Sequence, residues 1–186
     1  MPYTVLAVCT GNICRSPAIE LQLASALDAS VAVASAGTGA LVGHPVHAPM
    51  ARLLTQGGYD VDGFAARQLT PDLVAGADLI LTATPAHRGR DPVDHPGAVR
   101  RTLALAELAR LVSTIDPAVL AQLPAADDAG RLRALVDLAV RERPRHAGRR
   151  HDDDIADPYR RDDAAYRASY AHVSAAVGTI VGALRG

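Results

Sequence analysis

The chain has 186 residues, of which 49% are hydrophobic, and its formal net charge is -1 at pH 7. This length and composition allow one domain with a sizeable core, and we expect that domain to span residues 1–186. The nearly balanced charge gives no bulk electrostatic reason to expect a nucleic acid or an anionic membrane surface as a partner. Any affinity for phosphate must therefore come from a local site.

The cysteines indicate a reducing environment. Cys9 and Cys14 are the two cysteines of the chain and lie five residues apart, whereas a disulfide framework needs more cysteines spread along the sequence. The amino terminus lacks a basic segment followed by an apolar stretch, and no apolar run reaches membrane length. We therefore expect a cytoplasmic protein without membrane insertion.

Short apolar runs alternate with segments of helical spacing along the chain. The first run, residues 3–8, ends at the loop CTGNICRS, and the helical segment PAIELQLASALD follows it. A second run at 31–35 precedes a helix that a Gly-Gly pair ends. Further runs at 78–84 and near Thr102 each lead into helices or helical turns. This alternation predicts an α/β fold with four parallel strands.

The last third of the chain carries two predicted helices. One belongs to an added region at about 113–150 and is followed by a loop rich in Arg, Pro and Gly. The other is amphipathic, runs from about 164 to 184 and is long enough to cross one face of the sheet. Between them lies the acidic stretch HDDDIADPYRRDD.

The loop CTGNICRS has the features of a phosphate site. Gly11 permits backbone conformations that other residues rarely adopt, so successive N–H groups can converge on one anion at the positive end of a helix dipole. Arg15 can bind two phosphate oxygens. A thiol surrounded by these groups should ionise near neutral pH, which makes Cys9 a nucleophile that attacks phosphorus. A structural cysteine with a surface arginine is the alternative, and the strand before the loop and Pro17 after it favour the catalytic interpretation.

The segment VLAVCTGNICRSPAIE resembles the signature of the low-molecular-weight protein tyrosine phosphatases. The similarity continues through SAGTGALVGHPVHAP, ARQLTPDLVAGADLIL and DDDIADPY, and leaves out the region at about 113–150, which is atypical of the family. The resemblance implies a four-stranded parallel sheet flanked by helices on both faces, with the phosphate-binding loop after the first strand. It implies that Cys9 is the nucleophile, that Ser16 assists the thiolate, and that Asn12 and Ser35 brace the loop. The implied phosphate-binding residues are Thr10, Gly11, Asn12, Ile13, Cys14, Arg15 and Ser16.

The leaving oxygen needs a proton, and no acid lies near Cys9 in the sequence. Asp157 is the candidate, because Pro158 stiffens its turn and the matching Asp of the resembling family is the general acid. Tyr159 is expected to form one wall of the substrate cleft, and Leu41 the opposite wall, where the family often has a larger aromatic residue. The neighbouring carboxylates are interpreted as a solvated acidic run, namely Asp152, Asp153 and Asp154.

Two further observations concern Phe64 and the histidines. Phe64 stands where the family commonly has a His that supports the loop, which predicts a less rigid loop here. The seven histidines show no metal-ligand spacing and are interpreted as surface or structural residues, so we expect neither a metal nor a cofactor.

The predicted function is hydrolysis of phosphotyrosine in proteins through a cysteinyl-phosphate intermediate, with a cognate tyrosine kinase as a candidate partner. Three alternatives stay open: a small phosphate ester as substrate, phosphoarginine as substrate, and a phosphate-binding module without catalysis. Phosphoarginine would favour a Thr in place of Ile13, and a binding module would normally lack Cys9, Arg15 or Asp157. A thioredoxin-coupled arsenate reductase would need two further cysteines that this chain lacks.

Overall fold

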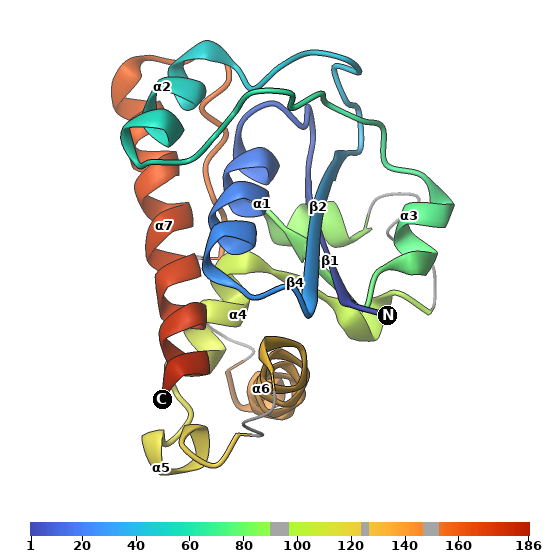
Figure 1. The fold of residues 1–186 in the computed structure, drawn as a ribbon, viewed down its shortest axis with the longest axis vertical. Helices are drawn as coiled ribbons and strands as arrows, with labels where there is room; N and C mark the ends of the chain where they lie inside the picture. Colours follow the sequence, from blue (N-terminus) through green and yellow to red (C-terminus); the bar gives the residue numbers. More distant parts are fainter. Residues whose placement is uncertain (90–96, 124–126, 147–152) are drawn as a thin grey trace.

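Four parallel strands form the centre of the molecule (Figure 1). The computed structural model describes residues 1–89, 97–123, 127–146 and 153–186. The strands are β1 (Tyr3–Cys9), β2 (Val31–Gly37), β3 (Leu79–Thr82) and β4 (Thr102–Ala104), in the order β2-β1-β3-β4. The predicted α/β class and the four parallel strands are confirmed. Because β1 pairs with β2 on one side and β3 on the other, the direction of winding changes at its carboxyl end, where sheets of this type bind ligands.

Helices cover both faces of the sheet, as expected. Successive side chains of β1 point to opposite faces, so Val5 and Ala7 join a large core while Leu6 and Val8 join a smaller one. The large core is covered by α1 (Arg15–Ala26), α2 (Ala48–Gln56), α4 (Leu105–Val112), α6 (Asp128–Glu142) and α7 (Asp163–Arg185). The smaller core lies under α3 (Pro71–Gly76). Figure 1 shows α7 running beside α1 on one side of the sheet and α3 on the other.

The sequence pattern did not predict α3. Its six residues are too few to show helical periodicity, although its start has a recognisable signal. The Thr70 side chain accepts a hydrogen bond from the Leu73 N–H at 3.3 Å, and Pro71 occupies the first turn.

The region at 113–150 contains the helix that was predicted there. It includes α5 (Pro117–Leu120), α6 and the 3-10 turn η3 (Arg143–His146). Leu132 and Leu135 of α6 are buried in the large core, so this helix is part of the same hydrophobic unit as the sheet. The rest of the predicted loop after α6 lies outside the described residues.

Two more 3-10 turns lie between β3 and β4, namely η1 (Pro85–Gly89) and η2 (Val99–Arg101). Of the helices that the structure describes, none is both long enough and apolar enough to cross a membrane.

Candidate active site

The loop between β1 and α1 has its carbonyl groups turned outward. Three main-chain hydrogen bonds join it to the segment after β2, from the N–H groups of Thr38, Gly39 and Leu41 to the carbonyls of Cys9, Thr10 and Gly11, at 2.9, 3.0 and 3.0 Å. Within the described part of the chain, the N–H groups of residues 11–15 donate no hydrogen bond. A row of unused donors at the start of a helix is suited to binding an anion.

Asn12 holds the loop in shape from inside. It is fully buried and has a positive φ of 53°, a conformation that Asn tolerates better than most residues. The side-chain NH₂ group of Asn12 donates to the hydroxyls of Ser16 and Ser35 at 2.9 and 2.7 Å, and its side-chain carbonyl accepts the Arg67 main-chain N–H at 2.8 Å. The prediction that Gly11 provides the unusual backbone conformation was wrong: Gly11 does not have a positive φ, and Asn12 does.

The Cys9 sulfur receives a directed hydroxyl group. Its Sγ lies 3.0 Å from the Ser16 Oγ. Because the Ser16 oxygen already accepts from Asn12, its own hydrogen is available to the sulfur. A hydroxyl that donates to sulfur favours the thiolate, which is both the attacking and the departing form of Cys9.

Three residues that hold the loop from behind were not identified from the sequence, namely Glu20, Arg67 and Gly37. Glu20 accepts a hydrogen bond from the Ser35 hydroxyl, and the Arg67 guanidinium donates to the Ser35 carbonyl at 2.7 Å. Glu20 and Arg67 therefore fix Ser35, which in turn accepts from Asn12. Burial raises the pKa of the Glu20 carboxyl. Gly37 is needed for a different reason: a Cβ there would overlap the Thr10 carbonyl oxygen. These contacts are made across the fold and have no local sequence signal.

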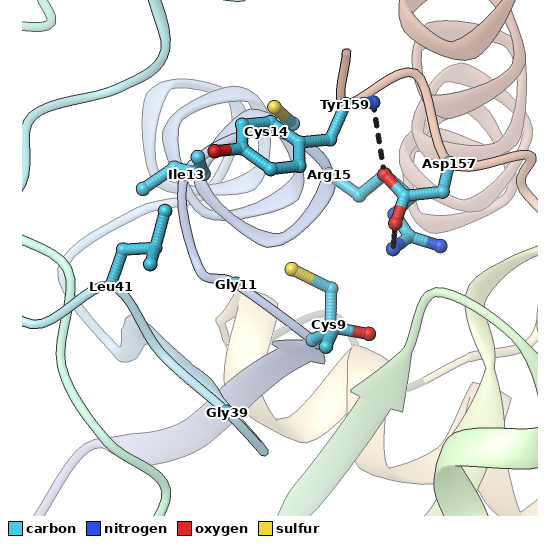
Figure 2. Close-up of a pocket in the computed structure, with 10 residues that line it drawn as sticks. Cys9, Gly11, Ile13, Cys14, Arg15, Gly39, Leu41, Asp157 and Tyr159 are labelled. Carbon is cyan, nitrogen blue, oxygen red and sulfur yellow. Dashed lines mark hydrogen bonds and ion pairs between the residues drawn. The ribbon is translucent and has the colours of Figure 1, made fainter. Parts of the chain in front are cut away.

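The loop forms the floor of a pocket whose walls are apolar. Figure 2 shows the Cys9 sulfur directed into this pocket, with Leu41 on one side and Tyr159 on the other. The remaining lining residues are Thr10, Gly11, Ile13, Cys14, Arg15, Gly39 and Asp157. The structure therefore brings together the predicted thiol, guanidinium, carboxylate and cleft walls.

Asp157 contacts the guanidinium of Arg15. Its Oδ2 lies 2.7 Å from the Arg15 Nη2, and its Oδ1 accepts the Tyr159 main-chain N–H at 3.1 Å (Figure 2). Arg15 is buried, whereas the Asp157 side chain is 49% exposed. The carboxylate thus lies at the mouth of the pocket.

The interpretation of the acidic run was wrong for Asp153. This side chain is 1% exposed and accepts two hydrogen bonds from Arg110, at 2.9 and 2.8 Å. Two residues later the Ile155 N–H donates to the Ala83 carbonyl at 3.0 Å, so the segment is tied to the fold before it reaches Asp157. Asp154 is exposed as expected, and Asp152 lies outside the described residues.

One of the described histidines, His87, contacts the phosphate-binding loop. His87 is buried, and its Nε2 lies 3.0 Å from the Thr10 hydroxyl. His95 and His151 lie outside the described residues. Phe64 is partly buried against the large core, and its effect on loop rigidity stays a prediction.

Comparisons with known proteins agree with this geometry. Residues 4–94 match the family model described as low molecular weight phosphotyrosine protein phosphatase. A probable low molecular weight protein-tyrosine-phosphatase, EpsP of Ralstonia solanacearum, is 39% identical over 129 residues, which cover 69% of this chain and 87% of the relative.

Solved structures with the same fold include two phosphatases. The tyrosine phosphatase AmsI of Erwinia amylovora is 26% identical, with a TM-score of 0.71 over 100% of this chain and 95% of its own. The YwlE arginine phosphatase of Geobacillus stearothermophilus is 23% identical, with a TM-score of 0.69 over 99% of this chain and 94% of its own. The second likeness concerns the fold alone.

Proposed function

Because this chain belongs to the low molecular weight phosphotyrosine protein phosphatase family, we propose that it hydrolyses phosphotyrosine in proteins through a cysteinyl-phosphate intermediate. The observation that carries this proposal is the convergence of Cys9, Arg15 and Asp157 on one pocket. The walls formed by Leu41 and Tyr159 suit a flat phenyl ring, and the apolar side chain of Ile13, which belongs to the loop, lines the pocket between them.

In the first step the Cys9 thiolate attacks phosphorus. An S–P bond forms and the P–O bond to the phenol breaks, while the loop N–H groups and the Arg15 guanidinium hold the three remaining phosphate oxygens. Substrate phosphate competes with the Asp157 carboxylate for Arg15, since that guanidinium holds the carboxylate at 2.7 Å. Asp157, protonated in the reactive complex, donates its proton to the leaving oxygen.

In the second step water replaces the thiolate on phosphorus. Asp157, now a carboxylate, accepts a proton from the attacking water, and the S–P bond breaks. The Ser16 hydroxyl stabilises the departing thiolate, because it lies 3.0 Å from the sulfur and its oxygen accepts from Asn12. The products are the free phenol and inorganic phosphate, and the enzyme returns to its starting state.

The cellular setting follows from the same chemistry. A thiolate nucleophile must stay reduced, and both cysteines are free thiols, which supports a cytoplasmic location. A protein-tyrosine kinase that produces phosphotyrosine must supply the substrate and is the partner that we infer.

A substrate panel with a nucleophile variant tests the proposal. We expect phosphotyrosine peptides to give a higher kcat/KM than phosphoserine peptides, phosphoarginine peptides and small alkyl phosphates. Cys9→Ser should lose turnover while phosphate binding survives, since the N–H groups of the loop are unchanged. A higher kcat/KM for phosphoarginine or for a small ester would replace the substrate assignment, and turnover by Cys9→Ser above about a hundredth of the wild-type rate would exclude Cys9 as nucleophile.

A further inference from the structure

We propose that His47 is a positioning residue that fixes the Tyr159 wall of the cleft relative to the phosphate-binding loop. The inference rests on the proposed function in one respect, since Tyr159 is taken as the surface on which the substrate ring packs. His47 does not line the pocket itself. Its ring contacts Tyr159, which does line the pocket.

The main chain of His47 is joined to the loop. Its N–H donates to the Ile13 carbonyl at 2.8 Å. Its own carbonyl accepts the first helical hydrogen bonds of α2, from Met50 and Ala51, at 2.9 Å each. His47 therefore moves with the loop and with the start of α2.

The imidazole ring is held in one orientation by Tyr166 of α7. The Nδ1 atom lies 2.9 Å from the Tyr166 hydroxyl, and the two rings are stacked with centroids 5.7 Å apart and an interplanar angle of 13°. Tyr166 is buried. A stacked ring and a hydrogen bond together leave the imidazole little freedom.

The same imidazole meets the Tyr159 ring at right angles. The centroids are 5.3 Å apart with an interplanar angle of 82°, an edge-to-face arrangement that aromatic pairs favour. Within the described part of the chain the Tyr159 hydroxyl makes no hydrogen bond, so ring contacts decide where this side chain lies. The Arg160 guanidinium lies 5.2 Å from the Tyr159 centroid, but its side chain is exposed.

Helix capping does not account for a His at this position. The residue before a helix is usually Ser, Thr, Asp or Asn, because its side chain accepts an N–H of the first turn. The His47 side chain makes no such bond. Its polar atom is used instead for Tyr166, and its ring for Tyr159.

The substitution His47→Asn removes the ring contact with Tyr159 and keeps the hydrogen bond to Tyr166 and the start of α2. Asn has a polar atom near the place of Nδ1 and caps a helix well, so it can bind Tyr166 and start α2 without touching Tyr159. We expect KM for para-nitrophenyl phosphate to rise about 3- to 10-fold, the range of one aromatic pair. The inhibition constant of inorganic phosphate should stay within about twofold, because phosphate contacts the loop and not the wall.

The matched control is His44→Asn, three residues earlier, where the side chain is exposed. It should leave both constants unchanged. A parallel rise of KM and of the phosphate inhibition constant in His47→Asn would make His47 a support of the loop rather than of the wall. Two unchanged constants would overturn the proposal as well.

A fluorescence measurement tests the positioning without any turnover. The chain has no Trp, so Tyr159→Trp places a single indole at the wall. We expect lower emission anisotropy and stronger acrylamide quenching when His47→Asn is added to Tyr159→Trp. Equal values in the two proteins would overturn the inference. An enzyme that turned over no aryl phosphate would instead contradict the proposed function, and the fluorescence comparison would still decide the role of His47.

Discussion

Asp157 and Arg15 differ in exposure, and this difference matters for their roles. The arginine is fixed at the floor of the pocket, with its Nη1 donating to the Ile155 carbonyl at 3.3 Å, whereas the aspartate is half exposed at the mouth. A proton donor must reach the leaving oxygen, which points out of the pocket when phosphorus faces Cys9. The exposed carboxylate therefore fits the acid and the buried guanidinium fits the anion clamp.

Asp157→Asn should slow phosphoryl transfer most for poor leaving groups. Without a proton donor, the rate of phosphoryl transfer from an aryl phosphate whose phenol has a high pKa should fall about 10²- to 10⁴-fold. The rate for a very acidic phenol should fall much less. Single-turnover kinetics across graded phenols isolate this step from hydrolysis of the intermediate. A uniform loss across all phenols would make Asp157 a structural residue.

The two cysteines should differ in reactivity. Burial is the main cause that raises the pKa of Cys14 to about 12, and the neighbouring Cys9 and Asp157 contribute to the same rise. At pH 7 only roughly one Cys14 in 10⁵ is then a thiolate. We expect iodoacetamide to leave Cys14 unmodified in the folded Cys9→Ser variant and to label it fully after denaturation, as measured by mass spectrometry. Rapid labelling of the folded variant would contradict the burial of this thiol.

At the scale of the elements, the last residue of β2, Gly37, lies so close to the phosphate-binding loop that a side chain would not fit there. Gly37 pairs with Cys9 in the sheet, and its main chain donates to the Arg67 carbonyl at 3.0 Å. Asn12 also approaches it, with main-chain N and Cβ atoms 3.0 Å from where a Gly37 Cβ would lie. The loop can close on β2 only because this position lacks a side chain.

Gly37→Ala should destabilise the fold by roughly 1–3 kcal/mol, the usual cost of inserting an atom into a packed region. The inhibition constant of inorganic phosphate should rise in the same variant, because Thr10 and Asn12 must move. Denaturant unfolding and phosphate inhibition measure the two effects. Gly76→Ala is the control: a Cβ there meets nothing within 4 Å, and the change should be neutral or slightly stabilising. Equal stability of the two variants would show that the loop adapts without strain.

At the scale of the whole molecule, a polar junction joins the start of α6, in the region at 113–150, to the ends of α1 and α7. The Asp28 and Asp128 side chains each accept the other's main-chain N–H, at 3.2 and 2.8 Å. Arg185, at the end of α7, donates to Asp128 at 2.7 Å and to the Ala26 carbonyl at 2.7 Å. The end of α1, the start of α6 and the end of α7 therefore meet at one point.

This junction should make stability depend on pH in the acid range. Hydrogen bonds from the Ser30 side chain and main chain hold the pKa of Asp28 below its ordinary value of 3.8. A lowered pKa in the folded state contributes stability above pH 3.8, and that contribution is lost as the pH falls through the folded value. We expect Asp28→Asn to lower the Tm at pH 7 and to approach the wild-type Tm near pH 3.

Thermal unfolding between pH 7 and pH 3 measures this convergence. The exposed Asp154 provides the control, since Asp154→Asn should follow the wild-type curve throughout. A Tm difference between Asp28→Asn and wild type that stayed constant over the whole range would mean that Asp28 acts through packing and not through its charge.

Local patterns were sufficient for much of this protein. The alternation of apolar runs and helical segments predicted the four parallel strands, α6 and α7, because those periodicities depend on neighbours within one element. The loop signature predicted the family, since Cys9 and Arg15 lie in one short stretch whose spacing reflects the chemistry directly. The structure brings Asp157 to the same pocket, and its role as acid stays a prediction.

Only the tertiary structure decided which side chains support that site. Asp153 is buried because Arg110 of α4 lies against it, and His47 meets Tyr159 because α2 and the segment before α7 come together. Such contacts join residues far apart in the chain, so no periodicity or spacing in either segment records them. The same reason applies to Gly37, whose missing side chain is required by a loop that lies more than twenty residues earlier in the sequence.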